Sequence, residues 1–236
     1  MDQLSLFKWR HFTGEIIICG VRWYLRYALS YRDVDELMRE REVSVDHTTI
    51  FRWVQRYAPE LEKQCRRSLR QTNDSYRVDE TYIKIKKRWY YLYRAVDSAG
   101  QTIDFLLSTR RDAQAAERFF RKALRAKHTG TPRVITVNTN AAYPPAFEVL
   151  QQEKTLPESC TLRQCKYLNN VVEQDHRFLK RRINPGLGFG SFRTARRTLR
   201  GYEAMHMIRK GQIKGVAKGD VLVQNRAIAQ IFGLTA

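Results

Sequence analysis

Acidic residues, cysteines and long apolar runs are all scarce in this chain of 236 residues. Its 24 acidic residues face 43 basic ones, so the formal net charge at neutral pH is +19. A balance this basic favours a polyanionic partner, and nucleic acid is the first candidate. The alternative is a solvated basic surface with no such partner. The apolar content of 43% is ordinary for a globular protein, so the chain can bury a core.

No apolar run in the sequence approaches the length that a membrane-spanning helix needs. Residues 1–8 also lack the order of charged, apolar and small residues that marks a signal peptide. We therefore expect a cytoplasmic protein.

The few cysteines follow no Cys-x-x-Cys spacing. Cys160 and Cys165 lie close enough in sequence to share a zinc ion with His176, but no second pair of ligands supports such a site. We therefore expect reduced thiols without a metal.

Two capped helices are expected near the N-terminus, after a first helix over residues 15–29. Ser30, followed three residues later by Asp33, has the pattern of a capping box. Asp46 is expected to cap a second helix over residues 47–57, with Pro59 beyond its end. Two short helices joined by a few residues form a helix-turn-helix, although an ordinary helical hairpin has the same pattern.

The second helix of a helix-turn-helix enters the major groove of DNA and places its N-terminal residues against base edges. Basic side chains on this helix, in a chain of such positive charge, favour DNA binding over a plain hairpin. The residues that we expect against DNA are His47, Thr48, Thr49, Arg52 and Arg56.

The pattern after residue 74 predicts an α/β domain. Tyr, Val, Ile and Trp gather in strand-like runs, separated by turn signals and by segments with helical spacing. The expected strands cover 75–86, 88–96, 101–109, 133–137 and 161–167, and the expected helices cover 114–127 and 146–152. Three antiparallel strands, a helix, a buried strand, a helix and a further strand form the order of an RNase H-like domain, a mixed five-stranded sheet with flanking helices.

Three polar residues stand where a two-metal site of this architecture has its acids. Asp79 lies in the first strand, Asn138 ends the buried strand after Val137, and Glu173 lies on a late helix. Two metal ions neutralise the attacking and leaving oxygens of a phosphodiester, and magnesium prefers carboxylate ligands. Here the middle residue is an amide. An RNase H-like nuclease for another substrate is a weaker reading of the same pattern.

The late helix and the residues after it are basic. Glu173, His176, Arg177 and Lys180 share one helical face, as in a site that places metal beside phosphate; an exposed helix with charge pairs is the alternative. Residues 180–210 are rich in Lys and Arg. The glycines of residues 186–190 do not follow a strand as in a dinucleotide site, so we reject a nucleotide cofactor.

Several of these segments carry the motifs of one family. They are 47–54, 78–82, 91–97, 104–108 and the spacing Glu173-x-x-His176-x-x-x-Lys180. Together they resemble the DDE transposases of the insertion sequence six family, and the resemblance covers about residues 6–211.

The resemblance implies a helix-turn-helix domain over 1–62, a linker over 63–74, an RNase H-like DDE catalytic domain with a basic C-terminal helix over 75–212, and a tail over 213–236. It implies Mg²⁺ or Mn²⁺ as cofactor, double-stranded DNA (terminal inverted repeats and target) as partner, and at least a homodimer. It also implies a bacterial, nucleoid-associated protein that forms cointegrates. Its catalytic positions are Asp79, Asn138, Glu173 and Lys180, its metal positions Asp79, Asn138 and Glu173, and its further DNA-binding positions His176, Arg177, Arg181 and Arg182.

The chain departs from the family at one catalytic position. The family has an aspartate where this chain has Asn138, while Ala141-Ala142-Tyr143 follow the expected pattern, so the alignment has not slipped. Between Thr131 and Leu150 the only acid is Glu148. We therefore predict a transposase impaired in metal-dependent strand transfer. The alternative is a relic that binds terminal repeats without chemistry and competes with active copies.

Overall fold

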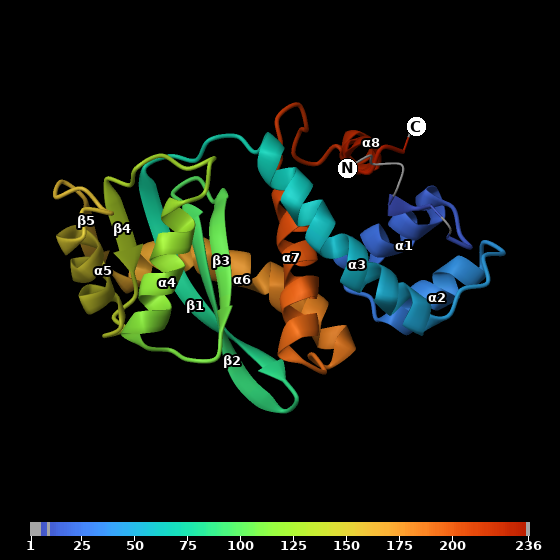
Figure 1. Ribbon diagram of the computed structural model, residues 1–236, viewed down its shortest axis with the longest axis horizontal. Helices are drawn as coiled ribbons and strands as arrows, with labels where there is room; N and C mark the ends of the chain where they lie inside the picture. Colours follow the sequence, from blue (N-terminus) through green and yellow to red (C-terminus); the bar gives the residue numbers. More distant parts are fainter. Residues whose placement is uncertain (1–5, 9, 235–236) are drawn as a thin grey trace. The chain divides into compact units, whose positions relative to one another are not determined.

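The computed structural model describes residues 6–8 and 10–234, which form two compact units (Figure 1). One unit contains the chain up to Leu69 and from Leu179 onward, and the other contains Arg70–Phe178. The helix α6 (Asn170–Ile183) begins in the second unit and ends in the first. No helix among the described residues is both long and apolar enough to cross a membrane.

The first unit is helical. Its main helices are α1 (Gly14–Arg26), α2 (Tyr31–Arg39), α3 (His47–Cys65), α7 (Phe192–Arg209) and α8 (Val221–Ile231), with short 3-10 turns at Arg66–Ser68 and Asn184–Gly186. The capping box of α2 is confirmed, because Ser30 Oγ accepts from the Asp33 N–H while Asp33 Oδ2 accepts from the Ser30 N–H. Asp46 caps α3 through the N–H groups of Thr48 and Thr49, as expected.

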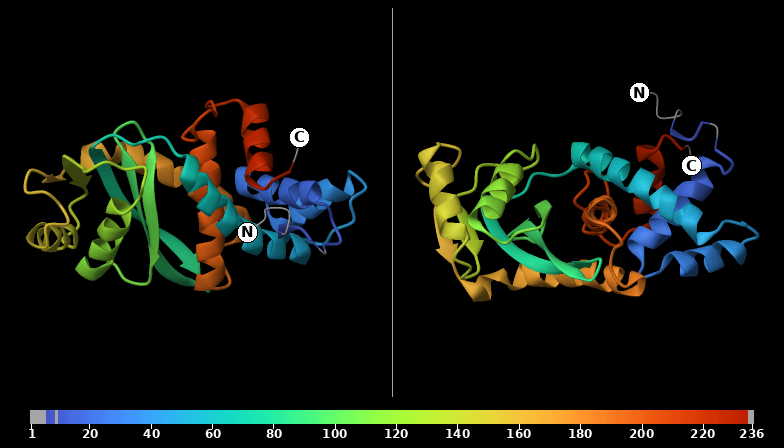
Figure 2. Two further views of the ribbon diagram at one scale, coloured as in Figure 1. Left: turned by 45° about the horizontal axis from the view of Figure 1, so that its top comes forward. Right: turned by 60° about the horizontal axis from the view of Figure 1, so that its bottom comes forward.

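α3 runs eight residues further than the sequence predicts, to Cys65 rather than Tyr57, and Pro59 lies inside it. Helix α7 packs against α3, and the two helices cross in Figures 1 and 2. Gly201 lets the two helices approach closely, since a Cβ there would lie 2.5 Å from the Cβ of Ala58. Burial of Ala58 and Leu61 in this contact outweighs the backbone hydrogen bond that a proline removes.

The compact units differ from the domain boundaries that we predict, because α7 packs on α3 and thus joins the N-terminal helices. The expected tail, 213–236, contains helix α8. Asp220 caps α8 by accepting from the Val223 N–H, and Ile228 and Phe232 are buried. The boundaries themselves stay a prediction.

The second unit is a mixed five-stranded sheet with helices on both faces (Figure 2). Its elements are β1 (Ser75–Ile85), β2 (Arg88–Asp97), β3 (Thr102–Ser108), α4 (Ala113–Leu124), β4 (Val134–Val137), α5 (Tyr143–Gln152), β5 (Thr161–Gln164), a 3-10 turn at Lys166–Asn169 and the start of α6. The strand order is β3-β2-β1-β4-β5, with β1, β2 and β3 antiparallel and β4 and β5 parallel to β1. This is the RNase H-like α/β fold that the sequence predicts.

Alternation along β1 divides the functions of its two faces. Tyr76 and Val78 point into a core with Phe119 and Phe120 of α4. Asp79 points to the other face, where its neighbour Arg94 on β2 donates to Asp175 of α6 at 2.5 Å. The second face therefore carries Asp79 and the buried ion pair, and the first carries the apolar core together with the buried carboxyl of Glu80.

Candidate active site

The topology brings Asp79 and Asn138 together. Arg77 of β1 pairs with Thr136 of β4 in a parallel register, so two residues further on Asp79 lies beside position 138. Glu173 enters from the first turn of α6. A cavity of about 520 Å³ is lined by Asp79, Glu80, Arg111, Asn138, Thr139, Asn140, Asn169 and Glu173. The three positions singled out from the sequence thus share one cavity within the second unit.

The amide of Asn138 is bonded on both sides. Its Nδ2 donates to Asp79 Oδ1 at 2.7 Å, and its Oδ1 accepts from the Asn140 N–H at 3.0 Å. On the other side of Asp79, His176 Nδ1 lies 3.7 Å from Oδ2. Asp79 is therefore held between an amide donor and an imidazole.

The pKa of the Asp79 carboxyl is raised to a value near neutral pH. Burial, and then the nearby carboxylates of Glu80 and Glu173, raise its pKa from 3.8 to about 7, while the hydrogen bond from Asn138 opposes the shift. Charge is costly here because three acids meet and no cation contacts Asp79 at hydrogen-bonding distance among the interactions described.

Glu80, which the sequence analysis did not single out, anchors the opposite side of β1. It accepts from Arg111 Nε at 2.6 Å, from Asn140 Nδ2 at 3.0 Å and from the Tyr143 hydroxyl. Burial, and then the charge of Glu80, raise the pKa of Tyr143, which keeps this hydroxyl a donor. The position of Glu80 directly after Asp79 is a sequence signal for a role in the site. Its hydrogen-bond partners, however, come from segments distant in the sequence.

The residues present do not fit a two-metal site. Asn138 turns its N–H₂ group toward Asp79, so a donor stands where a metal needs an anionic oxygen, and its own oxygen is already bonded to Asn140. Among the described side chains, no group of three or more His, Cys, Asp and Glu is placed to hold a metal ion. Two carboxylates and an amide make a weak donor set for magnesium.

The basic residues of α6 have different surroundings. Arg177, Lys180 and Arg181 are exposed, with Lys180 two turns after Glu173, about 10 Å along the helix. His176 is buried beside Asp79 rather than facing solvent. Its imidazole therefore lies in the candidate active site and not on an exposed helical face, while a DNA contact of His176 stays a prediction.

Arg182 also has different surroundings from those that we expected, and its contact with DNA stays a prediction. Its side chain is buried, Nε donates to the carbonyl oxygen of Leu25 at 3.2 Å, and Nη2 donates to that of Arg26. Burial lowers the pKa of the guanidinium to about 9. Arg182 thus satisfies carbonyl groups at the C-terminal end of α1, a role that no local sequence pattern predicts.

The expected DNA-binding residues lie on the first turns of α3. Arg52 and Arg56 are exposed, whereas the hydroxyls of Thr48 and Thr49 donate to Asp46 at 2.5 and 2.8 Å. These bonds lower the pKa of Asp46 and tie both threonines to the helix cap. The arginines are thus the freer contacts for a ligand, while His47 is half-buried near Asp35.

A hollow of about 500 Å³ lies beside these arginines. It is lined by Phe51, Arg52, Gln55, Arg56, Pro59, Arg197 and Arg200. Arg200 is paired with Glu62 at 2.8 Å, but Arg197 of α7 adds a cation that the sequence analysis did not assign to this surface. Only the packing of α7 on α3 brings it there.

A mixed sheet in this strand order, with acids on its first strand and on a late helix, defines an RNase H-like polynucleotidyl transferase core. The family model of the DDE domain of IS240 transposases matches residues 73–212. The chain is 38% identical over 234 residues to the transposase for insertion sequence-like element IS431mec of Staphylococcus aureus (strain Mu50), covering 98% of this chain and 95% of that protein. The transposase for insertion sequence element IS257 in transposon Tn4003 of Staphylococcus aureus matches with the same identity and coverage. The chain belongs to the DDE transposases of the insertion sequence six family.

Solved structures give more distant likenesses. The HTLV-2 integrase catalytic core domain in complex with magnesium (trimeric form) has a TM-score of 0.41 and 18% identity, covering 50% of this chain and 73% of that one. A chain of the simian T-cell lymphotropic virus intasome has a TM-score of 0.46 and 15% identity, covering 64% and 52%. The fold assignment rests on the strand order and on the family match.

The raised pKa of Asp79 predicts that stability falls as pH rises. Since its folded pKa of about 7 exceeds the ordinary 3.8, its contribution is fully present below pH 4 and is lost as pH rises through 7. At about 1.4 kcal/mol per pKa unit, the loss is on the order of a few kcal/mol. Urea unfolding at pH 5 and pH 8 should show this fall in the parent and in Glu148→Gln, an exposed acid. Asp79→Asn should flatten it, and an unchanged slope would contradict the assignment.

Proposed function

We propose that this chain binds the terminal inverted repeats of a bacterial insertion sequence and that its strand-transfer chemistry is impaired at position 138. Family membership supports transposition as the inherited activity and DNA as the partner. The observation that carries the impairment is the contact of Asn138 Nδ2 with Asp79 Oδ1. An amide donor there opposes the binding of the Mg²⁺ or Mn²⁺ that family members would use.

In this proposal, α2 and α3 form the helix-turn-helix that reads the repeat. The exposed cations Arg52 and Arg56 on α3 and the positive net charge support contact with DNA phosphates and base edges. Exposed Arg177, Lys180 and Arg181 would contact phosphates near the candidate active site. A homodimer that holds two repeats, working in the cytoplasm on the nucleoid, completes the proposal.

A second candidate function is a relic that occupies terminal repeats without chemistry. The same contact of Asn138 with Asp79 supports it, because that contact involves no residue of the proposed DNA-binding helix α3. One measurement distinguishes the two candidate functions, namely strand transfer by the unmodified protein. Activity above background favours an impaired transposase, and its complete absence together with tight binding favours the relic.

DNA binding is tested on α3. Arg52→Ala and Arg56→Ala are each expected to weaken binding to duplex DNA from the ends of the element by about 1–3 kcal/mol if the arginine contacts a base. A phosphate contact would instead lower the slope of log K against log salt by about one. Lys63→Ala is the matched control, an exposed cation near the other end of the same helix. Fluorescence anisotropy without metal measures all three, and equal affinities would contradict DNA binding by α3.

A further inference from the structure

The β1–β2 hairpin extends beyond the rest of its sheet. The pairing of β2 with β3 ends at Tyr91 and Ser108, and that of β1 with β4 ends at Arg77. Past these points the two strands pair only with each other, and Figure 1 shows this ribbon reaching beyond the sheet at the bottom of the view. A two-stranded ribbon has little stability of its own, so an extension of this kind suggests that its side chains have a function.

The two faces of the ribbon differ sharply in exposure. Ile83 and Ile85 on one face are 2% and 1% exposed. Tyr82 and Trp89 on the other face are 47% and 60% exposed. Residues that face each other across the strands share a face. The exposed face, here named the hairpin platform, consists of the pairs Tyr82 with Tyr91 and Lys84 with Trp89.

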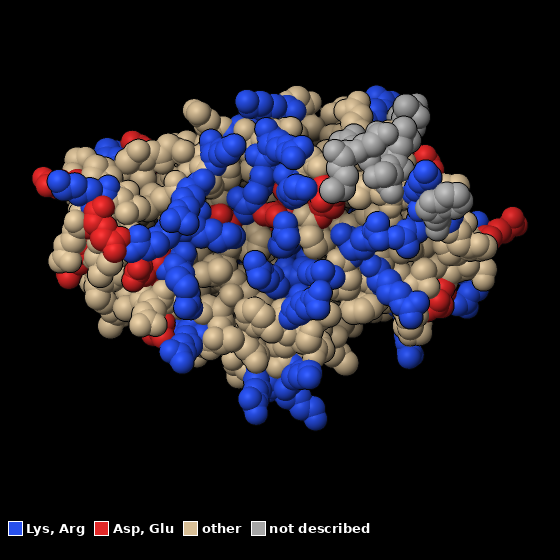
Figure 3. Space-filling model, viewed as in Figure 1, with Lys and Arg blue, Asp and Glu red and all other residues tan. Residues whose placement is uncertain are grey.

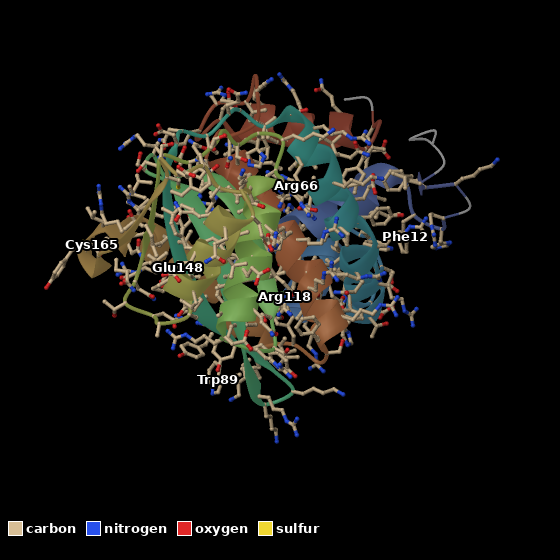
Figure 4. The ribbon with its side chains drawn as sticks, turned by 60° about the vertical axis from the view of Figure 1, so that its left-hand side comes forward. Phe12, Arg66, Trp89, Arg118, Glu148 and Cys165 are labelled. Carbon is tan, nitrogen blue, oxygen red and sulfur yellow. The ribbon has the colours of Figure 1, made fainter. Side chains whose placement is uncertain are left out.

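The rings of the hairpin platform contact one another and a cation. Tyr82 and Trp89 meet edge to face with centroids 6.3 Å apart, and Tyr82 and Tyr91 lie 5.4 Å apart. Lys84 Nζ lies 5.7 Å from the centre of the Trp89 ring. Figure 4 shows Trp89 at the outer edge of the molecule beside the hairpin. An exposed cluster of aromatic rings with a neighbouring cation matches the surfaces on which bases stack.

The turn that closes the hairpin retains lysines at positions where the backbone disfavours them. Lys86 and Lys87 have φ angles of 47° and 65°, and a two-residue turn with both φ positive normally takes Asn-Gly. With Lys84 and Arg88 they place four cations around the ribbon tip, and residues 83–96 contain no acid. Figure 3 shows this tip as a group of Lys and Arg at the bottom of the view. The positive charge is thus kept at a conformational cost.

We propose that the hairpin platform binds the unpaired end of a DNA strand, stacking a base on Trp89 and Tyr82 while the surrounding lysines and arginine contact its phosphates. This inference rests on the proposed function, since it needs a chain that binds DNA. Tyr82 stands two residues after Glu80 on the same face of β1, about 7 Å further along the strand. Because Glu80 lines the candidate active site, a strand end held on the platform lies beside that cavity.

Charge decides between DNA and a second copy of this chain as the occupant. A symmetric contact between two copies would bring the four cations of each tip together without any acid from residues 83–96 to offset them. A nucleic-acid strand supplies both the rings and the negative charge that this surface lacks.

The test compares a blunt duplex with the same duplex carrying a single-stranded oligo(dT) tail. The parent is expected to bind the tailed DNA more tightly, and Trp89→Ala and Tyr82→Ala to weaken that binding about tenfold or more while changing blunt-duplex binding little. Trp89→Phe, which keeps a ring, should recover most of the loss. Tyr27→Ala is the matched control, an aromatic residue that is 45% exposed in the other unit. Thermal unfolding checks that each variant folds.

The charge of the tip is tested with Lys86→Asn combined with Lys87→Gly, which gives the turn its preferred residues and keeps the hairpin folded. The salt slope for tailed DNA should fall by about one to two, as expected for two lost phosphate contacts. Equal binding of tailed and blunt DNA by the parent, or unchanged affinity in the ring variants, overturns the proposal. It is also overturned if the ring variants lose a dimer in sedimentation while their DNA binding stays intact. Failure of the parent to bind either DNA would instead overturn the proposed function.

Discussion

Asn138→Asp is expected to raise metal-dependent strand transfer about a hundredfold or more. Loss of an outer-shell partner alone costs about 10–100-fold in metal affinity or activity, and position 138 corresponds to a direct ligand position of the family. In the present structure its Nδ2 donates to Asp79 Oδ1 at 2.7 Å. An aspartate cannot donate there when ionised, so it replaces the amide donor with an anionic oxygen that suits Mg²⁺ or Mn²⁺.

The measurement is joining of labelled DNA from the ends of the element to a target plasmid, with Mg²⁺ or Mn²⁺, together with calorimetric titration of either metal. Thr139→Asp is the control, because it adds a charge to an exposed neighbour that also lines the cavity. Asn138→Asp in an Asp79→Asn background should show no gain. If the parent already joins DNA as fast as Asn138→Asp, another residue completes the site and our assignment of position 138 is wrong.

Asp175→Ala is expected to destabilise the second unit by about 3–5 kcal/mol. Asp175 Oδ2 accepts from Arg94 Nη2 at 2.5 Å, and the side chain of Arg94 is 1% exposed. Removing the acid deprives a buried guanidinium of its ion pair with Asp175, which is far more costly than losing an exposed pair. Since Asp175 lies two residues after Glu173, the loss also frees the start of α6 from the sheet.

Urea unfolding measures this effect. Glu117→Ala is the control, because Glu117 pairs with Arg121 four residues along α4 with both side chains partly exposed, and its loss should cost less than about 1 kcal/mol. Asp175→Leu combined with Arg94→Leu should recover part of the loss, because neither charge of this pair then stays buried. A cost for Asp175→Ala similar to that of the control would show that the pair does not hold α6.

Features set by neighbours in the chain were predictable from the sequence. The capping box of Ser30 and Asp33 and the cap at Asp46 form over three residues, so the residue types alone specify them. Strands β1, β2 and β4 follow from runs of Tyr, Val and Ile between turn signals. The order of strands and helices along the chain, with acids on the first strand and a late helix and the amide at 138 between them, was therefore predictable from the sequence.

Features that depend on distant partners were missed. α3 continues through Pro59 because α7 covers it, and Arg182 is buried because the carbonyls of Leu25 and Arg26 need donors. His176 has the spacing of an exposed helical face, yet it lies buried beside Asp79. In each case a contact across many residues outweighed the local pattern.

The sequence by itself determined the class of this protein, the places of its acids and the change at Asn138, because residue identity and short-range periodicity carry that information. The tertiary structure decided what the change does to its neighbours. Only the parallel pairing of β1 with β4 places the amide against Asp79, and burial together with the nearby carboxylates of Glu80 and Glu173 raises the pKa of the Asp79 carboxyl to about 7. Electrostatic effects of this kind depend on distance and on exclusion of water, and folding sets both.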